Sequence, residues 1–377
     1  MLNFIIGRNN SGKTEKIRAL IAERASENKK CILIVPEQFS FESERSILEK
    51  IGAQKMLNVD ILSFTRLAFV INEQYGKALN KTIDDGTRKV LMSLSLEALS
   101  GKLEYFKRFS SKPALLSNLL TFVTELKQCA VTPDEIAEIS GKTGNKSLGK
   151  KLSELSLIAA SYDALVSRSF FDDENLLTIA ADMISETDFF DGKAVYFDAF
   201  CGFTTQERNC IKSILPKAEN VFISLCTDRD LSREGVSVCE NVNTEFSHLK
   251  ECAAEQNVGV SSPEILNVKE DGRSPELVYL EKYLCGEESE PYKEECDNIV
   301  VCAAGNRADE ADFVACEIKK LLRCNPTLRC RNIAVIERTA GTYDKELSES
   351  FKKYGVPMFE DKRRPIGIQP VMVFVKC

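Results

Sequence analysis

The sequence predicts an α/β protein built on a parallel β-sheet, with an all-helical block inserted into it and the start of a second α/β unit after it. Short apolar runs without polar alternation indicate strands that are buried on both faces. Helical periods separate these runs, except between about residues 67 and 183, where only helical periods occur. The 377 residues, 44% hydrophobic and 28% charged, are enough for two or three soluble domains.

Strands and helices alternate in the first part of the chain. The first apolar run stops at Gly7, and a helical pattern follows it directly. The expected elements are strands at 4–6, 31–35 and 59–62 and helices at 14–28 and 41–51. Because parallel strands need a long crossover connection, this order indicates a parallel sheet with helices on its faces.

Residues 67–189 form the expected helical block. Apolar residues such as Leu116, Leu119 and Val123 recur there at steps of three and four, and five or six helices fit the pattern. Residues 101–170 carry ten Lys/Arg and seven Asp/Glu, whereas the whole chain has a net charge of −7. A contact with nucleic acid would therefore be a local basic surface on an acidic protein.

Strands and helices return after the helical block. The expected elements are strands at 194–197 and 221–225 and helices at 206–215 and 276–284. An acidic, proline-containing linker at 285–298 precedes further strands at 299–301 and 333–336, with a helix at 308–323 between them. The predicted domains are residues 1–66 with 190–284, the inserted block 67–189, and the truncated start of a second α/β unit at 299–377.

Cysteine and histidine usage limits the chemistry. A single histidine, His248, excludes sites that need two imidazoles, and the fourteen cysteines form no C-x-x-C pair. We therefore expect reduced thiols, with Cys31, Cys226 and Cys302 acting as small core hydrophobes. The sequence starts without the features of a signal peptide, and no apolar stretch reaches about 18 residues, so we expect a cytoplasmic protein without membrane contact.

The most specific motif is Gly7-Arg8-Asn9-Asn10-Ser11-Gly12-Lys13-Thr14, which fits G-x-x-x-x-G-K-[ST] after a strand and before a helix. In such a loop, backbone N–H groups surround phosphate oxygens, the lysine reaches the β- and γ-phosphates, and the threonine hydroxyl ligates Mg²⁺. The alternative is a tight strand-to-helix turn that binds nothing. The residues expected to bind ATP and Mg²⁺ are Gly7, Asn10, Ser11, Gly12, Lys13 and Thr14.

Asp198 is the expected second Mg²⁺ ligand, because it directly follows an apolar strand. The next residue is Ala199, where a hydrolytic helicase has glutamate. We therefore expect ATP to be bound with weak or no hydrolysis, and assign no catalytic residue. The alternative is an aspartate that caps a turn at the end of its strand.

Several further stretches occur in a fixed order along almost the whole chain. They are Val35-Pro36-Glu37-Gln38, Ser63-Phe64-Thr65-Arg66-Leu67, Phe197-Asp198-Ala199-Phe200-Cys201-Gly202-Phe203-Thr204, Asn306-Arg307 with Glu310, Ile333-Ala334-Val335-Ile336-Glu337-Arg338, and Tyr354-Gly355-Val356-Pro357 before Asp361-Lys362-Arg363. With the loop at Gly7, this order resembles the AddB (RexB) family, the B subunit of the bacterial ATP-dependent helicase–nuclease that processes double-strand breaks.

The resemblance implies a superfamily 1 helicase-like body: a RecA-like P-loop domain, an inserted helical subdomain and the start of a second RecA-like domain. In this family the B subunit pairs with a motor A subunit and helps to hold single-stranded DNA and to read the regulatory Chi sequence. Its C-terminal nuclease domain carries an iron–sulfur cluster, and no part of this chain matches that domain. The implied partners are the A subunit and single- and double-stranded DNA, with no iron–sulfur cluster within this chain.

Other candidate residues follow from position and from the resemblance. Gln38 and Arg338 follow strands and are assigned to the nucleotide. The alternatives for Gln38 are a contact with DNA and a polar residue at a helix start, and the alternative for Arg338 is a solvent-exposed surface residue. The DNA candidates are Phe64, Arg66, Lys150 and Lys151. A basic run at 362–364 is a further candidate, while Arg307 and Glu310 are expected to pair across one helical turn.

Two other functions fit the same sequence. One is a structural scaffold whose P-loop is a relic, and the other is an independent P-loop ATPase or kinase that acts on a small molecule. A scaffold with a relic P-loop would bind no ATP or ADP, unlike the helicase-like protein. An independent ATPase or kinase would turn over ATP without DNA.

Overall fold

The computed structural model describes residues 1–76, 83–107, 112–169, 173–227, 239–267, 273–284, 290–360 and 374. The chain divides into two compact units, Met1–Pro291 and Tyr292–Cys377. The basic run at 362–364 lies outside the described residues.

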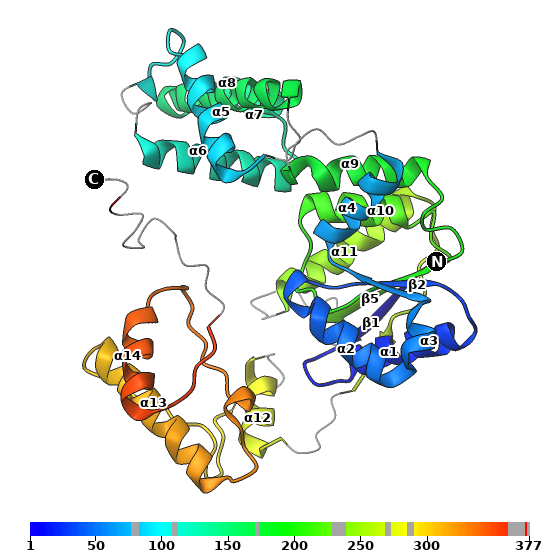
Figure 1. Cartoon of the computed structure of the whole chain (residues 1–377), viewed down its shortest axis with the longest axis vertical. Helices are drawn as coiled ribbons and strands as arrows, with labels where there is room; N and C mark the ends of the chain where they lie inside the picture. Colours follow the sequence, from blue (N-terminus) through cyan, green and yellow to red (C-terminus); the bar gives the residue numbers. More distant parts are fainter. Residues whose placement is uncertain are drawn as a thin grey trace. The chain divides into compact units, whose positions relative to one another are not determined.

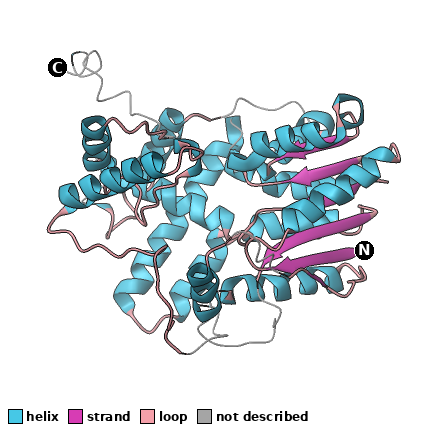
Figure 2. Ribbon diagram, turned by 90° about the horizontal axis from the view of Figure 1, so that it is seen from below, coloured by secondary structure: helices cyan, strands magenta, loops and turns pink. Residues whose placement is uncertain are grey.

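The N-terminal unit is built on a six-stranded sheet in which each strand pair is parallel (Figure 2). The strand order is β3-β2-β4-β5-β1-β6, so β5 separates β1 from β4. The bounds are β1 Leu2–Gly7, β2 Cys31–Ile34, β3 Val59–Leu62, β4 Ala194–Phe197, β5 Asn220–Cys226 and β6 Glu264–Ile265. Because the strands are parallel, their carboxyl ends lie at one edge of the sheet, where α/β proteins bind ligands.

Helices cover both faces of this sheet (Figure 1). The strand side chains alternate between these two faces. Phe4 and Ile6 pack with the helices α4, α9, α10 and α11, whereas Ile5 packs with α1 and α2 on the other face. Burial on both faces explains why the strands read as continuous apolar runs. The bounds are α1 Lys13–Ser26, α2 Ser40–Ile51, α3 Ala53–Met56, α4 Phe64–Tyr75, α9 Asp173–Glu186, α10 Thr205–Ile214, α11 Glu240–Glu255 and α12 Pro275–Leu284.

The helical block has its own hydrophobic core. It consists of α5 (Asp85–Ala98), α6 (Pro113–Gln128), α7 (Pro133–Lys142) and α8 (Lys146–Ser169), with a core that includes Met92, Leu119, Ile158 and Tyr162. The helices α4 and α9, which flank this group in the sequence, pack on the sheet instead. The prediction of a helices-only stretch is confirmed, and its two end helices belong to the hydrophobic core of the sheet.

The C-terminal unit contains two packed helices, α13 (Arg307–Cys324) and α14 (Asp344–Tyr354). Ala315, Ile318 and Phe351 form its small core, and Asp312 accepts hydrogen bonds from the side chains of Ser350 and Lys353. The predicted helix at 308–323 is therefore confirmed.

The two strands predicted in this unit are wrong. Residues 299–301 and 333–336 form no strand, and Val301 and Ile336 are 93% and 90% exposed. Their apolar, β-branched side chains favour a strand, but a strand needs a neighbour, and none pairs with them among the described residues of this unit.

The remaining differences concern two unpredicted helices, an unpredicted strand and the cysteines. The helices α3 and α11 and the two-residue strand β6 were not predicted from the sequence. Cys31 is buried as predicted, and burial raises its pKa to about 11, whereas Cys226 and Cys302 are exposed, contrary to the prediction. The twelve cysteines in the part of the chain that the structure describes are free thiols. No described helix is both long and apolar enough to cross a bilayer.

Candidate functional site

The loop between β1 and α1 has the shape of a phosphate cradle. Asn10 and Gly12 both have positive φ angles, 59° and 88°, which turn the backbone sharply before Lys13 starts α1. The N-cap residue of α1 is Gly12, which has no side chain, and among the described residues no side-chain cap binds the first N–H groups of the helix. These groups and the helix dipole favour an anion at this position.

Gly7 is required because neighbouring atoms leave no room for a side chain, and not because of its backbone angles. A Cβ atom at this position would lie 2.3 Å from Ser11 Oγ and 2.8 Å from the carbonyl oxygen of Leu266. Ser11 is itself 4% exposed, and its Oγ makes no hydrogen bond within the described residues. A side chain here would therefore displace the loop, and Ser11 has hydrogen-bonding capacity that the protein does not use.

Lys13 folds back onto its own loop. Its ammonium group donates to the carbonyl oxygens of Gly7 at 2.8 Å and Arg8 at 2.7 Å. These two bonds hold the positive charge at the mouth of the cradle. A phosphate that enters the loop meets a lysine that is already in place.

Asp198 lies at the carboxyl end of β4 and is 5% exposed. Its backbone N–H donates to the carbonyl oxygen of Ile34, which continues the pairing with β2 by one residue. Its carboxylate Oδ1 accepts a hydrogen bond from Ser224 Oγ on β5. Ala199 has a φ of 65°, so the chain turns away immediately after the aspartate.

Asp198 and the phosphate cradle share one face and one edge of the sheet. Tyr196 packs on the face that α1 covers, and side chains alternate along a strand, so Asp198 faces the same side two residues later. Lys13 and Thr14 begin α1 at that edge. The backbone cradle, Lys13, Thr14 and Asp198 together suit a nucleotide with Mg²⁺: the loop and lysine would hold phosphate, and the hydroxyl and carboxylate would hold the cation.

Gln38 and Arg66 follow the two strands beyond β4. Gln38 is exposed in the 3₁₀ turn η1 (Glu37–Phe39) after β2, and Arg66 is exposed in the first turn of α4 after β3. Ser63 Oγ accepts a hydrogen bond from the backbone N–H of Arg66 and caps that helix. Because β2 and β3 are neighbours, both side chains lie at the same edge of the sheet.

Three exposed aromatic residues beside them were not predicted as site residues. Phe39, Phe41 and Phe69 are 38%, 78% and 48% exposed, on η1, α2 and α4. Sequence reasoning missed them because an aromatic residue in an amphipathic helix reads as core until its exposure is known.

Phe64 is the first residue of α4 and is buried, at 5% exposure. Its ring packs against Phe197, Phe200 and Phe203, with ring centroids 5.5–6.1 Å apart. Phe64 and Thr65 line a cavity of about 170 Å³. In this position Phe64 anchors the first turn of α4, which carries Arg66.

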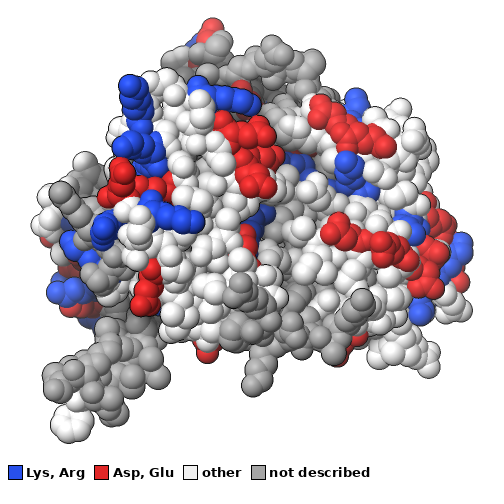
Figure 3. Space-filling view, turned by 90° about the horizontal axis from the view of Figure 1, so that it is seen from above, with Lys and Arg blue, Asp and Glu red and all other residues white. Residues whose placement is uncertain are grey.

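Lys150 and Lys151 lie on α8 and already have partners within the block. Lys150 Nζ lies 3.1 Å from Glu104 Oε2, and Lys151 Nζ is 5.9 Å from the ring centre of Tyr105. Basic and acidic side chains are intermixed on the face that Figure 3 shows. The predicted basic surface of the helical block is therefore partly neutralised.

Comparison with known proteins identifies the family of this sequence. A family model described as "ADDB, N-terminal" matches residues 4–281, which include the phosphate cradle, Gln38, Arg66 and Asp198. The chain belongs to the AddB family.

Named AddB relatives align over nearly the whole chain. The B subunit of the ATP-dependent helicase/deoxyribonuclease of Clostridium novyi is 31% identical over 99% of this chain, and that of Clostridium tetani is 32% identical over 99%. The corresponding protein of Acetivibrio thermocellus is 30% identical over 98%. In each case the chain spans 33% of the relative's length.

Arg338 lies outside the residues that the AddB model matches and belongs to the C-terminal unit. It is exposed and lines a cavity of about 350 Å³ with Glu310 and Tyr343. Glu310 accepts a hydrogen bond from Tyr343 Oη at 2.5 Å, and Arg307 donates to the carbonyl oxygen of Thr342. The predicted Arg307–Glu310 pair is thus replaced by contacts with the 342–343 turn.

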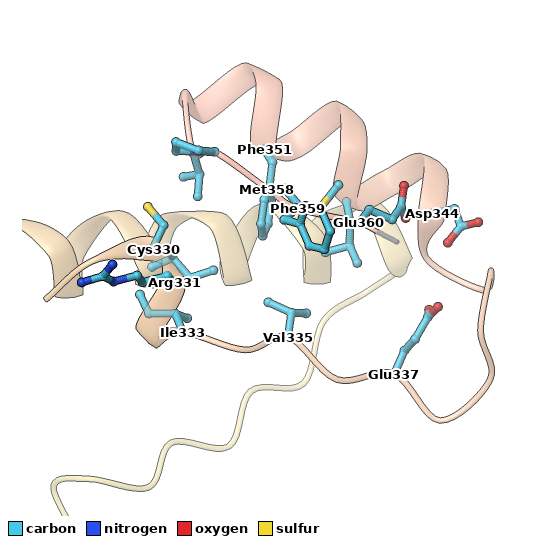
Figure 4. A pocket seen from close by; sticks show the side chains of 14 residues that line it. Cys330, Arg331, Ile333, Val335, Glu337, Asp344, Phe351, Met358, Phe359 and Glu360 are labelled. Atoms are coloured by element: carbon cyan, nitrogen blue, oxygen red, sulfur yellow. The ribbon is translucent and has the colours of Figure 1, made fainter. Parts of the chain in front are cut away.

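A larger cavity of about 710 Å³ lies between α13, α14 and the segment after η3 (Cys330–Asn332). Figure 4 shows Ile333 and Val335 on one side of it and Phe351 and Met358 on the other. Its lining is mainly apolar and includes the segment predicted as a strand. Among the described residues, no group of three or more His, Cys, Asp and Glu side chains is placed to bind a metal ion.

Proposed function

We propose that this chain is the helicase-like part of an AddB protein, which binds ATP with Mg²⁺ in its phosphate cradle and single-stranded DNA at the same edge of the sheet, at the ends of β2 and β3. In this proposal the unit around the sheet is a RecA-like first helicase domain, the block around α5–α8 is its inserted subdomain, and the C-terminal unit is the start of a second RecA-like domain. The observation that carries the proposal is that Lys13 and Asp198 share one face and one edge of a parallel sheet.

We propose that the chain binds ATP but hydrolyses it slowly or not at all. Lys13, Thr14 and the backbone of the loop supply phosphate and cation contacts, and Asp198 supplies a buried carboxylate. Ala199 has no side chain that can orient or deprotonate water. A bound nucleotide would therefore organise the loop without fast turnover.

Single-stranded DNA is the nucleic acid that fits the exposed side chains that follow β2 and β3. Arg66 can neutralise a phosphate, and Phe39, Phe41 and Phe69 offer faces on which bases stack. Gln38 supplies a polar group that can hydrogen-bond to a base edge. This combination of one cation and several aromatic faces is typical of single-strand binding rather than of duplex binding.

The wider role follows from the family. Its named relatives are B subunits of an ATP-dependent helicase/deoxyribonuclease. We propose that this chain acts in the cytoplasm with a motor A subunit and DNA, in the recombinational repair of double-strand breaks. Nuclease activity is not proposed for this chain, which spans 33% of the length of those relatives.

Two binding titrations test the proposal. The full chain should bind a fluorescent ATP analogue more tightly with Mg²⁺ than with EDTA, and should bind labelled single-stranded DNA with an affinity that falls steeply with salt. Absence of both interactions at low salt, with and without the A subunit, would contradict it.

One observation favours a second candidate, a structural protein with a relic P-loop. The ammonium of Lys13 is already held by two carbonyl oxygens of its own loop, so the loop is stable without phosphate. This candidate predicts no ATP or ADP binding by calorimetry, and assembly with the A subunit that Lys13→Ala leaves unchanged.

A further inference from the structure

Ser224 is a polar residue in the middle of a buried strand. It lies on β5, between Ile223 and Leu225, and is 4% exposed. Val221, Ile223 and Leu225 pack on the face of α4 and α10, so Ser224 faces the opposite side, which α1 covers. A buried hydroxyl at this position is unfavourable unless it has a hydrogen-bond partner.

The partner of Ser224 is Asp198. Ser224 Oγ donates to Asp198 Oδ1, and both side chains are at least nine-tenths buried. The register explains the contact: Phe197 on β4 pairs with Ile223 on β5, so Asp198 and Ser224 are the next residues of two adjacent strands. In the part of the chain that the structure describes, the other carboxylate oxygen, Oδ2, accepts no hydrogen bond from the protein.

The position of Ser224 also connects Asp198 to the strand of the phosphate cradle. On its other side β5 pairs with β1, with Ser224 opposite Ile5 and Cys226 opposite Gly7. Ser224 therefore stands between the carboxylate on β4 and the strand that leads into the loop. Its side chain is fixed by a backbone that is paired on both sides.

We propose that Ser224 is a positioning residue for the divalent cation of a bound nucleotide. By binding Oδ1 it holds the Asp198 carboxylate in one orientation and leaves Oδ2 for the cation, directly or through a water molecule. This inference rests on the proposed nucleotide site and adds a residue to it. Groups that orient a metal ligand in this way commonly change metal affinity 10–100-fold when they are removed.

Two substitutions of equal shape separate positioning from packing. Ser224→Thr keeps a hydroxyl donor, and Ser224→Val replaces that hydroxyl with a methyl group of nearly the same size. Both β-branched residues suit a central strand. Ser95→Ala serves as a control, because Ser95 is a fully buried serine whose hydroxyl donates to Leu91 O in the helical block.

The experiment titrates a fluorescent ATP analogue into the full chain, with EDTA and over a range of Mg²⁺ concentrations. We expect Ser224→Val to need about 10–100-fold more Mg²⁺ for the same increase in affinity, with its affinity in EDTA unchanged. Ser224→Thr and Ser95→Ala should stay within about threefold of the wild type. Thermal melting of each variant shows that it is folded before the titration.

The other outcomes overturn the inference in distinguishable ways. Equal Mg²⁺ dependence in Ser224→Val, Ser224→Thr and the wild type would leave Ser224 as a packing residue and the nucleotide site intact. Nucleotide binding that is independent of Mg²⁺ in the wild type would remove the cation role of Asp198 and with it that of Ser224. No nucleotide binding by the folded wild type would reject the nucleotide site itself. If Ser224→Val does not fold, equal Mg²⁺ dependence in Ser224→Ala and the wild type is the contradicting result.

Discussion

The ammonium group of Lys13 donates a hydrogen bond to the carbonyl oxygen of Gly7 at 2.8 Å, so the lysine closes the loop that precedes it. A second bond, to Arg8 O at 2.7 Å, completes the contact. An incoming phosphate must take over this charge, and each charge-assisted bond contributes about 1.5–3 kcal/mol. In the proposed nucleotide site, phosphate binding would therefore depend strongly on this one side chain.

Lys13→Ala is therefore expected to weaken ATP binding by roughly 10–100-fold, which is the equivalent of one such bond. Fluorescence titration with an ATP analogue measures the change. Lys16→Ala is the matched control, because Lys16 lies one turn further along the same helix side and pairs with Glu264 at 2.7 Å. Equal losses in the two variants would mean that general charge, and not the contact of Lys13, governs binding.

Gly7→Ala is expected to destabilise the N-terminal unit by about 1–3 kcal/mol, the usual effect of overpacking. The new Cβ would lie 2.8 Å from the carbonyl oxygen of Leu266, and this backbone atom cannot rotate away as a side chain can. Urea unfolding gives the free energy. At Gly101, by contrast, an added Cβ meets no atom within 4 Å, so Gly101→Ala should leave the unfolding midpoint nearly unchanged.

Most of the sheet could be predicted because its signals are local. The strands β1, β2, β4 and β5 are short, mainly apolar and mostly buried runs, whereas β3 has the exposed Asp60 in its middle. The bounds predicted for β3 and β4 match those observed. The tight loop between β1 and α1 was also predictable, because its glycines and Lys13 are close together in the sequence. The β6 strand was not, since two residues that pair with the edge of a sheet leave no pattern.

The parts that sequence could not give depend on contacts between distant residues. Ser224 and Asp198 are 26 positions apart and meet only because β4 and β5 pair in one register. The strand predicted at 333–336 failed for the opposite reason: Val335 and Ile336 have the right side chains, but no neighbouring strand pairs with them in the described part of the C-terminal unit. A segment forms a strand only when a neighbouring strand pairs with it, whereas β-propensity describes the side chains of that one segment.

Arg66→Ala is expected to weaken binding of single-stranded DNA and to lower the slope of log K against log salt by about 0.7, the contribution of one neutralised phosphate. Lys150→Ala should change the slope less, because Lys150 Nζ already lies 3.1 Å from Glu104 Oε2. Fluorescence anisotropy at several salt concentrations measures both slopes. A larger effect for Lys150 would move the DNA site to the helical block.

Glu154 holds a turn of the helical block, which sequence did not indicate. Its Oε1 accepts the backbone N–H groups of Glu104 and Tyr105, both at 2.8 Å, and its Oε2 accepts that of Phe106 at 3.1 Å. Glu154→Gln puts an amide donor opposite one of these N–H groups, so we expect a loss of about 2–3 kcal/mol, since Glu154 is only 6% exposed. Thermal unfolding checks this, with the exposed Glu138→Gln expected to have little effect.

The pair Arg24–Glu219 predicts a pH dependence of stability. Arg24 Nη2 lies 2.6 Å from Glu219 Oε2, and this contact links the end of α1 to the residue before β5. Arg24 Nη2 also donates a hydrogen bond to Gly192 O. The hydrogen bond from the Arg24 guanidinium lowers the pKa of Glu219 below its ordinary value of 4.5. The folded state therefore binds this proton less readily than the unfolded state, so the stabilisation is present above about pH 4.5 and is lost as the pH falls through the lowered pKa.

Glu219→Gln should consequently cost about 0.5 kcal/mol at pH 7, a small value because the Glu219 side chain is 46% exposed and water screens the pair. Between pH 7 and pH 5 the variant and the wild type should differ by a constant amount, and below pH 4.5 the difference should shrink towards zero. Urea unfolding at half-unit pH steps measures both curves. Glu49→Gln, which removes the carboxylate of an exposed pair with Arg45, should follow the wild type closely throughout. A difference for Glu219→Gln that grows as the pH falls would have the wrong sign for a lowered pKa and would show that the pair is not what stabilises this junction.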